Sequence, residues 1–152
     1  MSQVYDDAAL AVFERRIDEW LGTLAASLPI EAVERGDGDV RRWFVRLRGE
    51  EKDFTTVWLT LGQRTLRYET YVMPAPEENA DQLCEHLLRR NERLVGAHYS
   101  IGSEDAVFLR GELPLTALDE AELDRIIGTL YATVEQHFRG LLRIGFASRF
   151  RS

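Results

Sequence analysis

The residues of this chain that could carry out chemistry are few, and their spacing keeps them apart. Cys84 and His86 are the thiol and imidazole nearest to each other along the chain, and the surrounding residues predict a helix. Side chains two positions apart on a helix point to different sides, so these two cannot act together as a nucleophile and base. Cys84 lies among leucines at helical spacing, which predicts a buried structural cysteine.

The histidines, serines and glycines show no spacing typical of a reactive site. A metal site would require His86, His98 and His137, or nearby acids, to converge in the fold, and the sequence predicts neither a metal nor a cofactor. Ser100 stands in HYSIG, which lacks the leading glycine of a nucleophile elbow. We therefore expect a non-enzymatic protein that binds other proteins or regulates them. The alternative is an enzyme or small-ligand carrier with a pocket between sheet and helices.

Length, charge and cysteine content narrow the class of protein. The 152 residues, 45% of them apolar, suit a single domain over residues 1–152. A net charge of −7 argues against general binding to nucleic acid. No segment approaches the roughly 18 apolar residues that span a bilayer, and the N-terminus has no apolar run. With its single cysteine, the chain is expected to be cytoplasmic, without nucleic-acid or membrane partners.

Apolar residues recurring three or four positions apart predict three helices. The first spans Ala8 to Leu28. The second runs from about Pro76 to Leu94 and is capped by Gly96. The last begins after Asp119, the expected N-cap, with Glu122 at the capping-box position.

Alternating apolar and polar residues between these helices predict strands. The order of elements is helix, four strands, helix, two strands, helix. It favours an α+β fold in which an antiparallel sheet carries its helices on one face. The predicted strands are Ile30–Arg35, Arg41–Gly49, Asp53–Leu61, Arg64–Met73, Ala97–Ile101 and Ala106–Leu113. The predicted core includes Trp20, Leu24, Trp58, Leu87, Phe108, Val134 and Phe138.

Bulky side chains fall on both faces of the predicted sheet. We assign Phe54, Trp58 and Tyr68 to one face and Tyr71 to the other, and these four are the predicted partner-binding residues. Helices on one side cannot cover both faces, and large exposed apolar patches are rare on monomers. We therefore expect self-association, most simply a C2 homodimer through the sheet or the second helix, or a further protein partner.

The middle of the chain is locally basic. Residues 41–73 carry seven basic side chains and four acids, a local charge of +3. Arg42, Arg46 and Arg67 are the candidate anion-facing residues of this segment. Solvated positions on strands are the alternative interpretation of the same charges.

Three strings in the second half of the chain resemble the YbjN family of bacterial proteins, described as sensory transduction regulators. They are LLRRNERLVGAHYSIG at residues 87–102, VFLRGELPL at 107–115 and LLRIGFAS at 141–148. The resemblance implies an α+β domain similar to type III secretion chaperones. Those are small, acidic, usually dimeric proteins that hold segments of other proteins on helix and sheet surfaces. The family has no agreed catalytic residues, so none is carried over.

Overall fold

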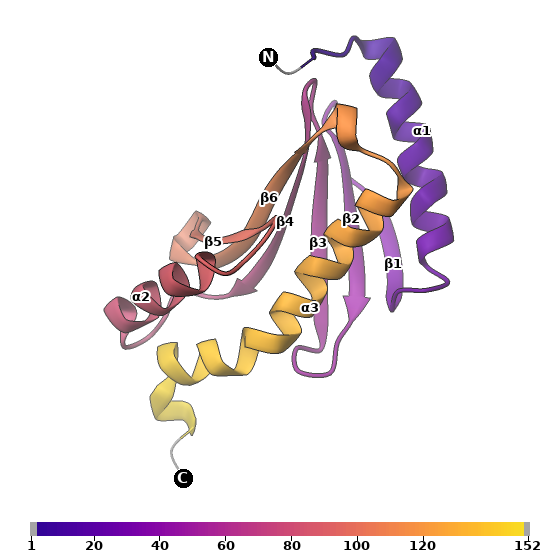
Figure 1. The fold of residues 1–152 in the computed structure, drawn as a ribbon. Coiled ribbons are helices and arrows are strands. Elements are labelled where there is room, and N and C mark those ends of the chain that lie inside the picture. The colour runs from indigo at the N-terminus through magenta and orange to yellow at the C-terminus, as the bar shows by residue number, and fades with distance from the viewer. Residues whose placement is uncertain (1–2, 151–152) are drawn as a thin grey trace.

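The computed structural model describes residues 3–150, which form a six-stranded antiparallel sheet and three α-helices (Figure 1). The element order is the predicted one, and the α+β fold class is confirmed. The helices are α1 (Asp7–Leu24), α2 (Ala80–Asn91) and α3 (Glu120–Gly145). The strands are β1 (Ile30–Arg35), β2 (Arg41–Arg48), β3 (Phe54–Leu61), β4 (Thr65–Met73), β5 (His98–Ile101) and β6 (Val107–Pro114).

The strands lie in the order β1-β2-β3-β4-β6-β5, so β1 and β5 form the two edges of the sheet. The first four strands follow one another as a meander, because short turns join neighbouring antiparallel strands. The connection through α2 then carries the chain past β4, and β6 returns beside β4 while β5 takes the outer place. The sheet thus brings residues from both halves of the chain onto one surface.

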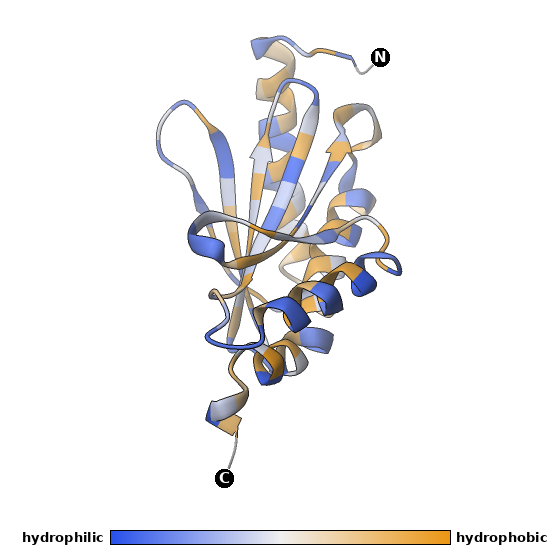
Figure 2. Ribbon diagram, turned by 90° about the vertical axis from the view of Figure 1, so that its left-hand side faces the viewer, coloured by the Kyte–Doolittle hydropathy of each residue, from blue (hydrophilic) through white to orange (hydrophobic). Residues whose placement is uncertain are grey.

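One face of the sheet is covered by α1 and α3, and α3 crosses the strands diagonally in Figure 1. Alternation along each strand sends every second side chain into this interface, and Figure 2 shows the resulting bands of apolar and polar residues. Trp43, Val45 and Leu47 of β2 are buried there, as their spacing predicts. From α3 the covered face receives Leu123, Ile127, Leu130, Val134 and Leu141.

The start of α3 is capped as predicted, although the capping box does not form. The side chain of Asp119 accepts a hydrogen bond from the backbone N–H of Glu122 at 2.8 Å. The Glu122 carboxylate instead accepts two hydrogen bonds from Arg125, at 2.7 and 3.0 Å. An ion pair within the first turns of the helix has replaced the reciprocal bond to the cap.

Helix α2 is shorter than predicted at both ends. Asn79, immediately before it, has a positive φ of 56°, and its side chain donates to the carbonyl of Ile144 at 2.9 Å. The backbone N–H groups of Glu77 and Glu78 bond to the carbonyl of Gly145 at 2.9 and 3.1 Å. Residues expected in the first turn of α2 therefore form hydrogen bonds with the carbonyl groups at the end of α3. Helix α2 ends at Asn91, so Gly96 is not its cap.

Several core predictions need correction. Leu24, Leu87 and Val134 are buried, whereas Trp20 and Phe138 are only partly buried and pack at the rim of the core. Trp58 and Phe108 lie on the opposite face of the sheet, where they are half-buried. Helix α1 ends at Leu24 rather than Leu28, because the last predicted turn closes as a looser turn before Pro29.

Candidate functional site

The sheet has an open face, on the side away from α1 and α3, and aromatic side chains gather on it. Four strands, β2, β3, β4 and β6, contribute these side chains, and its central residues are neighbours across strands. Trp58 of β3 lies between Phe44 of β2 and Glu69 of β4, and Tyr71 of β4 lies opposite Phe108 of β6. The aromatic members of this open sheet face are Phe44, Phe54, Trp58, Tyr71 and Phe108.

These aromatic rings form two edge-to-face pairs. The Phe44 and Trp58 centroids are 5.5 Å apart with their planes at 88°, and the Tyr71 and Phe108 centroids are 5.7 Å apart at 86°. Both geometries are favourable for aromatic pairs, which contribute about 0.5–1.5 kcal/mol beyond area burial. The pairs hold the rings in fixed positions, so the open sheet face presents an ordered surface.

A cation lies over most of these rings. The guanidinium of Arg46 is 3.8 Å from the Phe54 centroid, and that of Arg42 is 5.7 Å from the Trp58 centroid. On β6, the guanidinium of Arg110 is 5.1 Å from the Phe108 centroid. Such contacts are attractive, and the long side chains shield apolar surface from water. The open sheet face is therefore amphipathic: aromatic beneath, cationic at the surface.

At the centre of the open sheet face Glu69 balances part of this charge. Its carboxylate is 3.2 Å from Arg110 and 3.8 Å from Arg67. The Glu69 and Arg110 side chains are only 16% and 23% exposed, so their ion pair is much less hydrated than a surface pair. The pair links β4 to β6 across the open sheet face.

Lys52, in the loop between β2 and β3, contacts rings on both sides of the sheet. Its ammonium donates to the carbonyl oxygens of Tyr71 and Val72 at 2.8 and 3.2 Å and lies 5.2 Å from the Tyr71 ring centroid. Phe138 of α3 contributes a second ring at 5.5 Å. Burial lowers the pKa of Lys52 to about 8, because the charged form loses hydration.

Tyr68 does not lie on the open sheet face, contrary to the prediction. It is 3% exposed on the covered face, where its hydroxyl donates to the carbonyl of Gly96 at 2.5 Å. Its ring packs against Gly111 of β6, where a Cβ atom would lie 2.6 Å from a ring carbon. Phe54, Trp58 and Tyr71, in contrast, share the open sheet face. Whether these three bind a partner stays a prediction.

The three candidate anion-facing arginines all lie on the open sheet face and do not converge on one point. Arg42 donates to the Thr60 hydroxyl at 3.0 Å, and Arg46 stacks on Phe54. Arg67 is half-exposed beside Glu69. A surface cavity of about 390 Å³ is lined by Ala32, Glu34, Phe44, Arg46 and Thr56. It opens on this face and does not lie between sheet and helices.

A second candidate surface lies where α2 meets β5, and we call it the α2–β5 groove. It consists of two adjoining hollows of about 260 and 230 Å³. Cys84, Leu87 and Ile101 line both, and Leu88 lines the smaller one. Leu88 is 70% exposed and Ile101 53% exposed. Cys84 is partly exposed in this groove, which corrects the prediction that it is buried.

The edge of β5 beside the groove is closed by a side chain of α2. The amide of Asn91 accepts a hydrogen bond from the backbone N–H of Tyr99 at 2.6 Å and donates to its carbonyl at 3.1 Å. The amide thus imitates a neighbouring strand at this residue, and edge strands commonly avoid unwanted pairing by such covering. Sequence alternation gives no sign of this contact, which depends on where α2 packs.

The three histidines lie on separate elements of the fold, and one of them forms a contact that the sequence does not predict. Tyr99 of β5 contacts His137 of α3, and its Oη lies 2.7 Å from Nδ1 of the imidazole. His86 is on α2, and His98 is exposed on β5. Within residues 3–150, no three histidine, cysteine or acidic side chains gather as metal ligands. Over the same residues, no helix combines the length and apolarity needed to cross a membrane.

The fold is shared with solved structures of other proteins. Solved structures with the same architecture include a chain of the heterodimeric ExoU–SpcU complex from the type III secretion system of Pseudomonas aeruginosa. That chain has a TM-score of 0.56 and 16% identity, over 82% of this chain and 96% of that one. A chain of the ExsC–ExsE complex gives a TM-score of 0.59 and 17% identity, over 84% and 95%. The fold is that of type III secretion chaperone-like domains.

The chain belongs to the YbjN family, whose model, described as "Putative bacterial sensory transduction regulator", matches residues 16–143. Similar relatives are the uncharacterized proteins Rv0487 of Mycobacterium tuberculosis and ML2442 of Mycobacterium leprae. Rv0487 is 36% identical over 104 residues, or 68% of this chain and 57% of the relative. ML2442 is 34% identical over 107 residues, or 70% and 58%. The chain thus spans less than two thirds of these relatives' length.

Proposed function

We propose that this chain is a non-enzymatic adaptor domain of the bacterial cytoplasm that forms a homodimer and binds a segment of another protein. The observation that carries the proposal is the α2–β5 groove, where Leu88 and Ile101 stand exposed beside two apolar hollows. A contiguous apolar surface of this kind is unfavourable in water and is typical of protein contacts. YbjN membership and the chaperone-like fold support a protein-binding role.

We assign the homodimer contact to the α2–β5 groove. A two-fold axis brings the same patch of both copies together, so Leu88 of each copy would enter a hollow beside Cys84 of the other. Asn91 already occupies the edge of β5 at Tyr99, so side-chain packing, not extension of the sheet, is the expected mode of contact. A stable interface of this kind buries at least about 1,000 Å² in total.

We assign the partner segment to the open sheet face. Trp58, Phe54 and Tyr71 provide rigid aromatic area, and tryptophan, tyrosine and arginine are enriched among residues that dominate binding. Arg42, Arg46 and Arg67 add positive charge over that area. The chemistry that fits this combination is a segment with apolar side chains flanked by acids.

The homodimer assignment is tested by a charge in the groove. Leu88→Glu should shift the protein to a monomer of 17.5 kDa in light scattering, because a carboxylate would be buried without a partner. Ala132→Glu places the same charge on an exposed position of α3 and serves as the matched control. A Leu88→Glu protein that stays as dimeric as the control would show that the groove is not the interface.

The partner assignment is tested by pull-down from the native host with matched variants. Trp58→Ser should abolish capture of any partner that the unmodified chain retains, whereas Val40→Ser, in the exposed turn before β2, should not. Both variants are first checked for unchanged circular dichroism. Equal capture by the two variants would remove the open sheet face from the proposal.

A further inference from the structure

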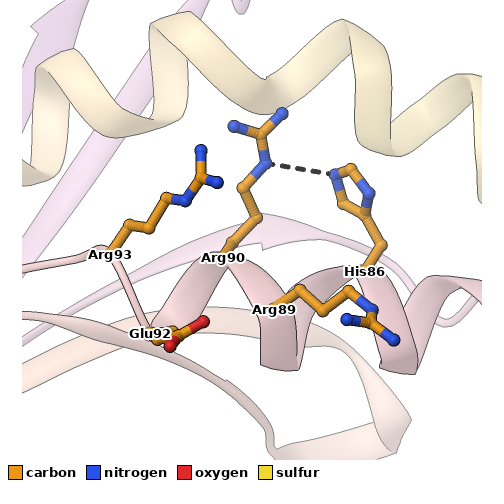
Figure 3. Close-up of a pocket in the computed structure, with 5 residues that line it drawn as sticks. All are labelled: His86, Arg89, Arg90, Glu92 and Arg93. Atoms are coloured by element: carbon orange, nitrogen blue, oxygen red, sulfur yellow. Dashed lines mark hydrogen bonds between the residues drawn. The ribbon is translucent and has the colours of Figure 1, made fainter.

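A basic cavity lies on the flank of α2 away from the α2–β5 groove. It has a volume of about 320 Å³ and is lined by His86, Arg89, Arg90, Glu92 and Arg93. His86, Arg90 and Arg93 follow one another at spacings of four and three residues, which places them on one side of the helix and its final turn. Figure 3 shows these three side chains extending toward α3, while Arg89 and Glu92 lie on the other side.

The Arg90 guanidinium is held in a fixed direction by a hydrogen bond. Its Nε donates to Nε2 of His86 at 3.3 Å (Figure 3). His86 therefore accepts with this nitrogen and is neutral in this arrangement. The contact uses only Nε, and the two terminal nitrogens of Arg90 point toward α3 without a hydrogen bond to residues 3–150 (Figure 3). A guanidinium held in this way is prepared to bind an oxyanion with two parallel hydrogen bonds.

The positive charge of this cavity exceeds the negative charge of its lining, in which Glu92 is the carboxylate. Arg89 pairs with Glu85 at 3.3 Å, but no carboxylate of residues 3–150 pairs with Arg90 or Arg93. Arg90 lowers the pKa of both His86 and His137, after the larger effect of burial. Two guanidinium groups that form no ion pair within residues 3–150 thus line one cavity.

A simpler interpretation is that these arginines only complement the negative end of the helix dipole. That role requires positive charge near the C-terminus of α2 and contributes about 0.3–1 kcal/mol. It requires neither the hydrogen bond between His86 and Arg90 nor a cavity into which two guanidinium groups point. Arg89, which is paired and exposed, would serve the dipole equally well.

We propose that His86, Arg90 and Arg93 form a binding site for the phosphoryl group of a small phosphate-bearing molecule. Two guanidinium groups match the two charges and the several oxygens of a phosphomonoester, whereas a carboxylate would leave one of them unpaired. The cavity volume is at the lower end of the range for small-molecule sites, which suits a compact ligand. His86 acts as a positioning residue that orients Arg90.

The site is independent of the proposed homodimer, because its residues occupy the opposite side of α2 from Cys84 and Leu88. Ligand binding here is therefore expected to occur in the Leu88→Glu protein as well. This expectation separates failure of the phosphate site from failure of the adaptor proposal.

The test is a titration of the full chain with inorganic phosphate and, separately, with phenyl phosphate, at constant ionic strength and pH 7.5. The readout is the C–H resonances of the histidine rings in heteronuclear NMR. The His86 resonances should shift and saturate with either probe, while sodium chloride at equal ionic strength should leave them unchanged. Tighter binding of phenyl phosphate would identify a phosphomonoester as the preferred ligand, and equal binding would identify free phosphate.

Three glutamine variants complete the test. Arg90→Gln and Arg93→Gln should each weaken phosphate binding at least about tenfold, because each removes a charge-assisted contact. Arg89→Gln removes the same charge from the paired arginine and should change affinity less than about threefold. Arg93 is exposed, so its variant should fold even if Arg90→Gln does not. Absence of a saturable shift up to 20 mM phosphate, or equal losses in all three variants, would overturn the proposal.

Discussion

Replacing Tyr99 with phenylalanine should destabilise the domain, because the Tyr99 hydroxyl makes a buried hydrogen bond. It lies 2.7 Å from Nδ1 of His137, and the two residues are 4% and 8% exposed. Phenylalanine keeps the ring in place but leaves the imidazole nitrogen of α3 without a partner. A buried polar group in that situation costs about 1–3 kcal/mol. For a domain of this size, about 2 kcal/mol lowers the Tm by roughly 4–8 °C.

The pH dependence of stability provides a second readout of the same contact. Burial, then the charges of Arg90 and His86, lower the pKa of His137 in the folded protein, and the pKa of His86 is lowered by burial and Arg90. The unfolded chain therefore binds protons near pH 6.5 before the folded chain does. The free energy of unfolding should be fully present above pH 6.5 and fall as the pH drops toward the lowered pKa values.

Urea titrations at pH 7.5 and pH 5.5 measure both effects. The Tyr99→Phe protein should unfold at lower urea than the parent at pH 7.5, and the parent should unfold at lower urea at pH 5.5 than at pH 7.5. Tyr5→Phe is the matched control, since the structure gives the Tyr5 ring an edge contact with Phe13 and no hydrogen bond to its hydroxyl among residues 3–150. A Tyr99→Phe protein within about 0.5 kcal/mol of the parent at pH 7.5 would refute the reasoning.

Three further predictions concern single side chains. Lys52 is the one lysine of the sequence, and its acetylation rate, followed by peptide mass spectrometry, should reach half its maximum near pH 8; a midpoint above pH 10 would contradict its burial. Phe138→Ala should cost about 2 kcal/mol in a urea titration, below the usual 3–5 for a fully buried phenylalanine; a cost above about 4 would mean complete burial. Asp119→Ala should cost about 1 kcal/mol by removing the N-cap of α3, and an unchanged midpoint would argue against that cap.

Alternation along a single strand predicts which of its residues share a face. The pairing between strands decides which face of one strand continues which face of the next. Trp43, Val45 and Leu47 share the covered face as their spacing predicts. The prediction for Tyr68 is wrong, because the register of the β3–β4 hairpin pairs this residue with the buried Leu59. A tyrosine opposite a buried leucine follows that leucine into the core.

The candidate surfaces could be predicted only in part for the same reason. Surplus aromatic residues in β3 and β4 indicate that one sheet face is uncovered. They do not indicate that Arg46 stacks on Phe54, or that Phe108 joins the same surface from β6. The α2–β5 groove depends on the end of α2 at Asn91, three residues before the Leu94 that the sequence pattern predicts. These features depend on contacts between segments that are distant in the sequence, and local sequence patterns do not predict such contacts.

The sequence does not predict which arginines form contacts with neighbouring side chains. Clustered arginines in residues 41–73 indicated an anion-facing patch, whereas the structure engages Arg42 and Arg46 with neighbouring side chains. Arg90 and Arg93 also lack a carboxylate partner among residues 3–150, and they lie in a segment whose sequence indicates only a helix end. Which arginine keeps a free guanidinium is decided by the carboxylates that the fold brings near it.

The most direct test of the adaptor proposal is the mass of the unmodified chain in solution as a function of concentration. Light scattering coupled to size exclusion, from about 1 to 200 μM, should show the mass rise from the 17.5 kDa of one chain toward twice that value. Over the same range, labelling of Cys84 by a thiol reagent should become slower, because the groove is covered in the dimer. A mass that stays at 17.5 kDa, with Cys84 equally reactive throughout, would contradict self-association through the α2–β5 groove.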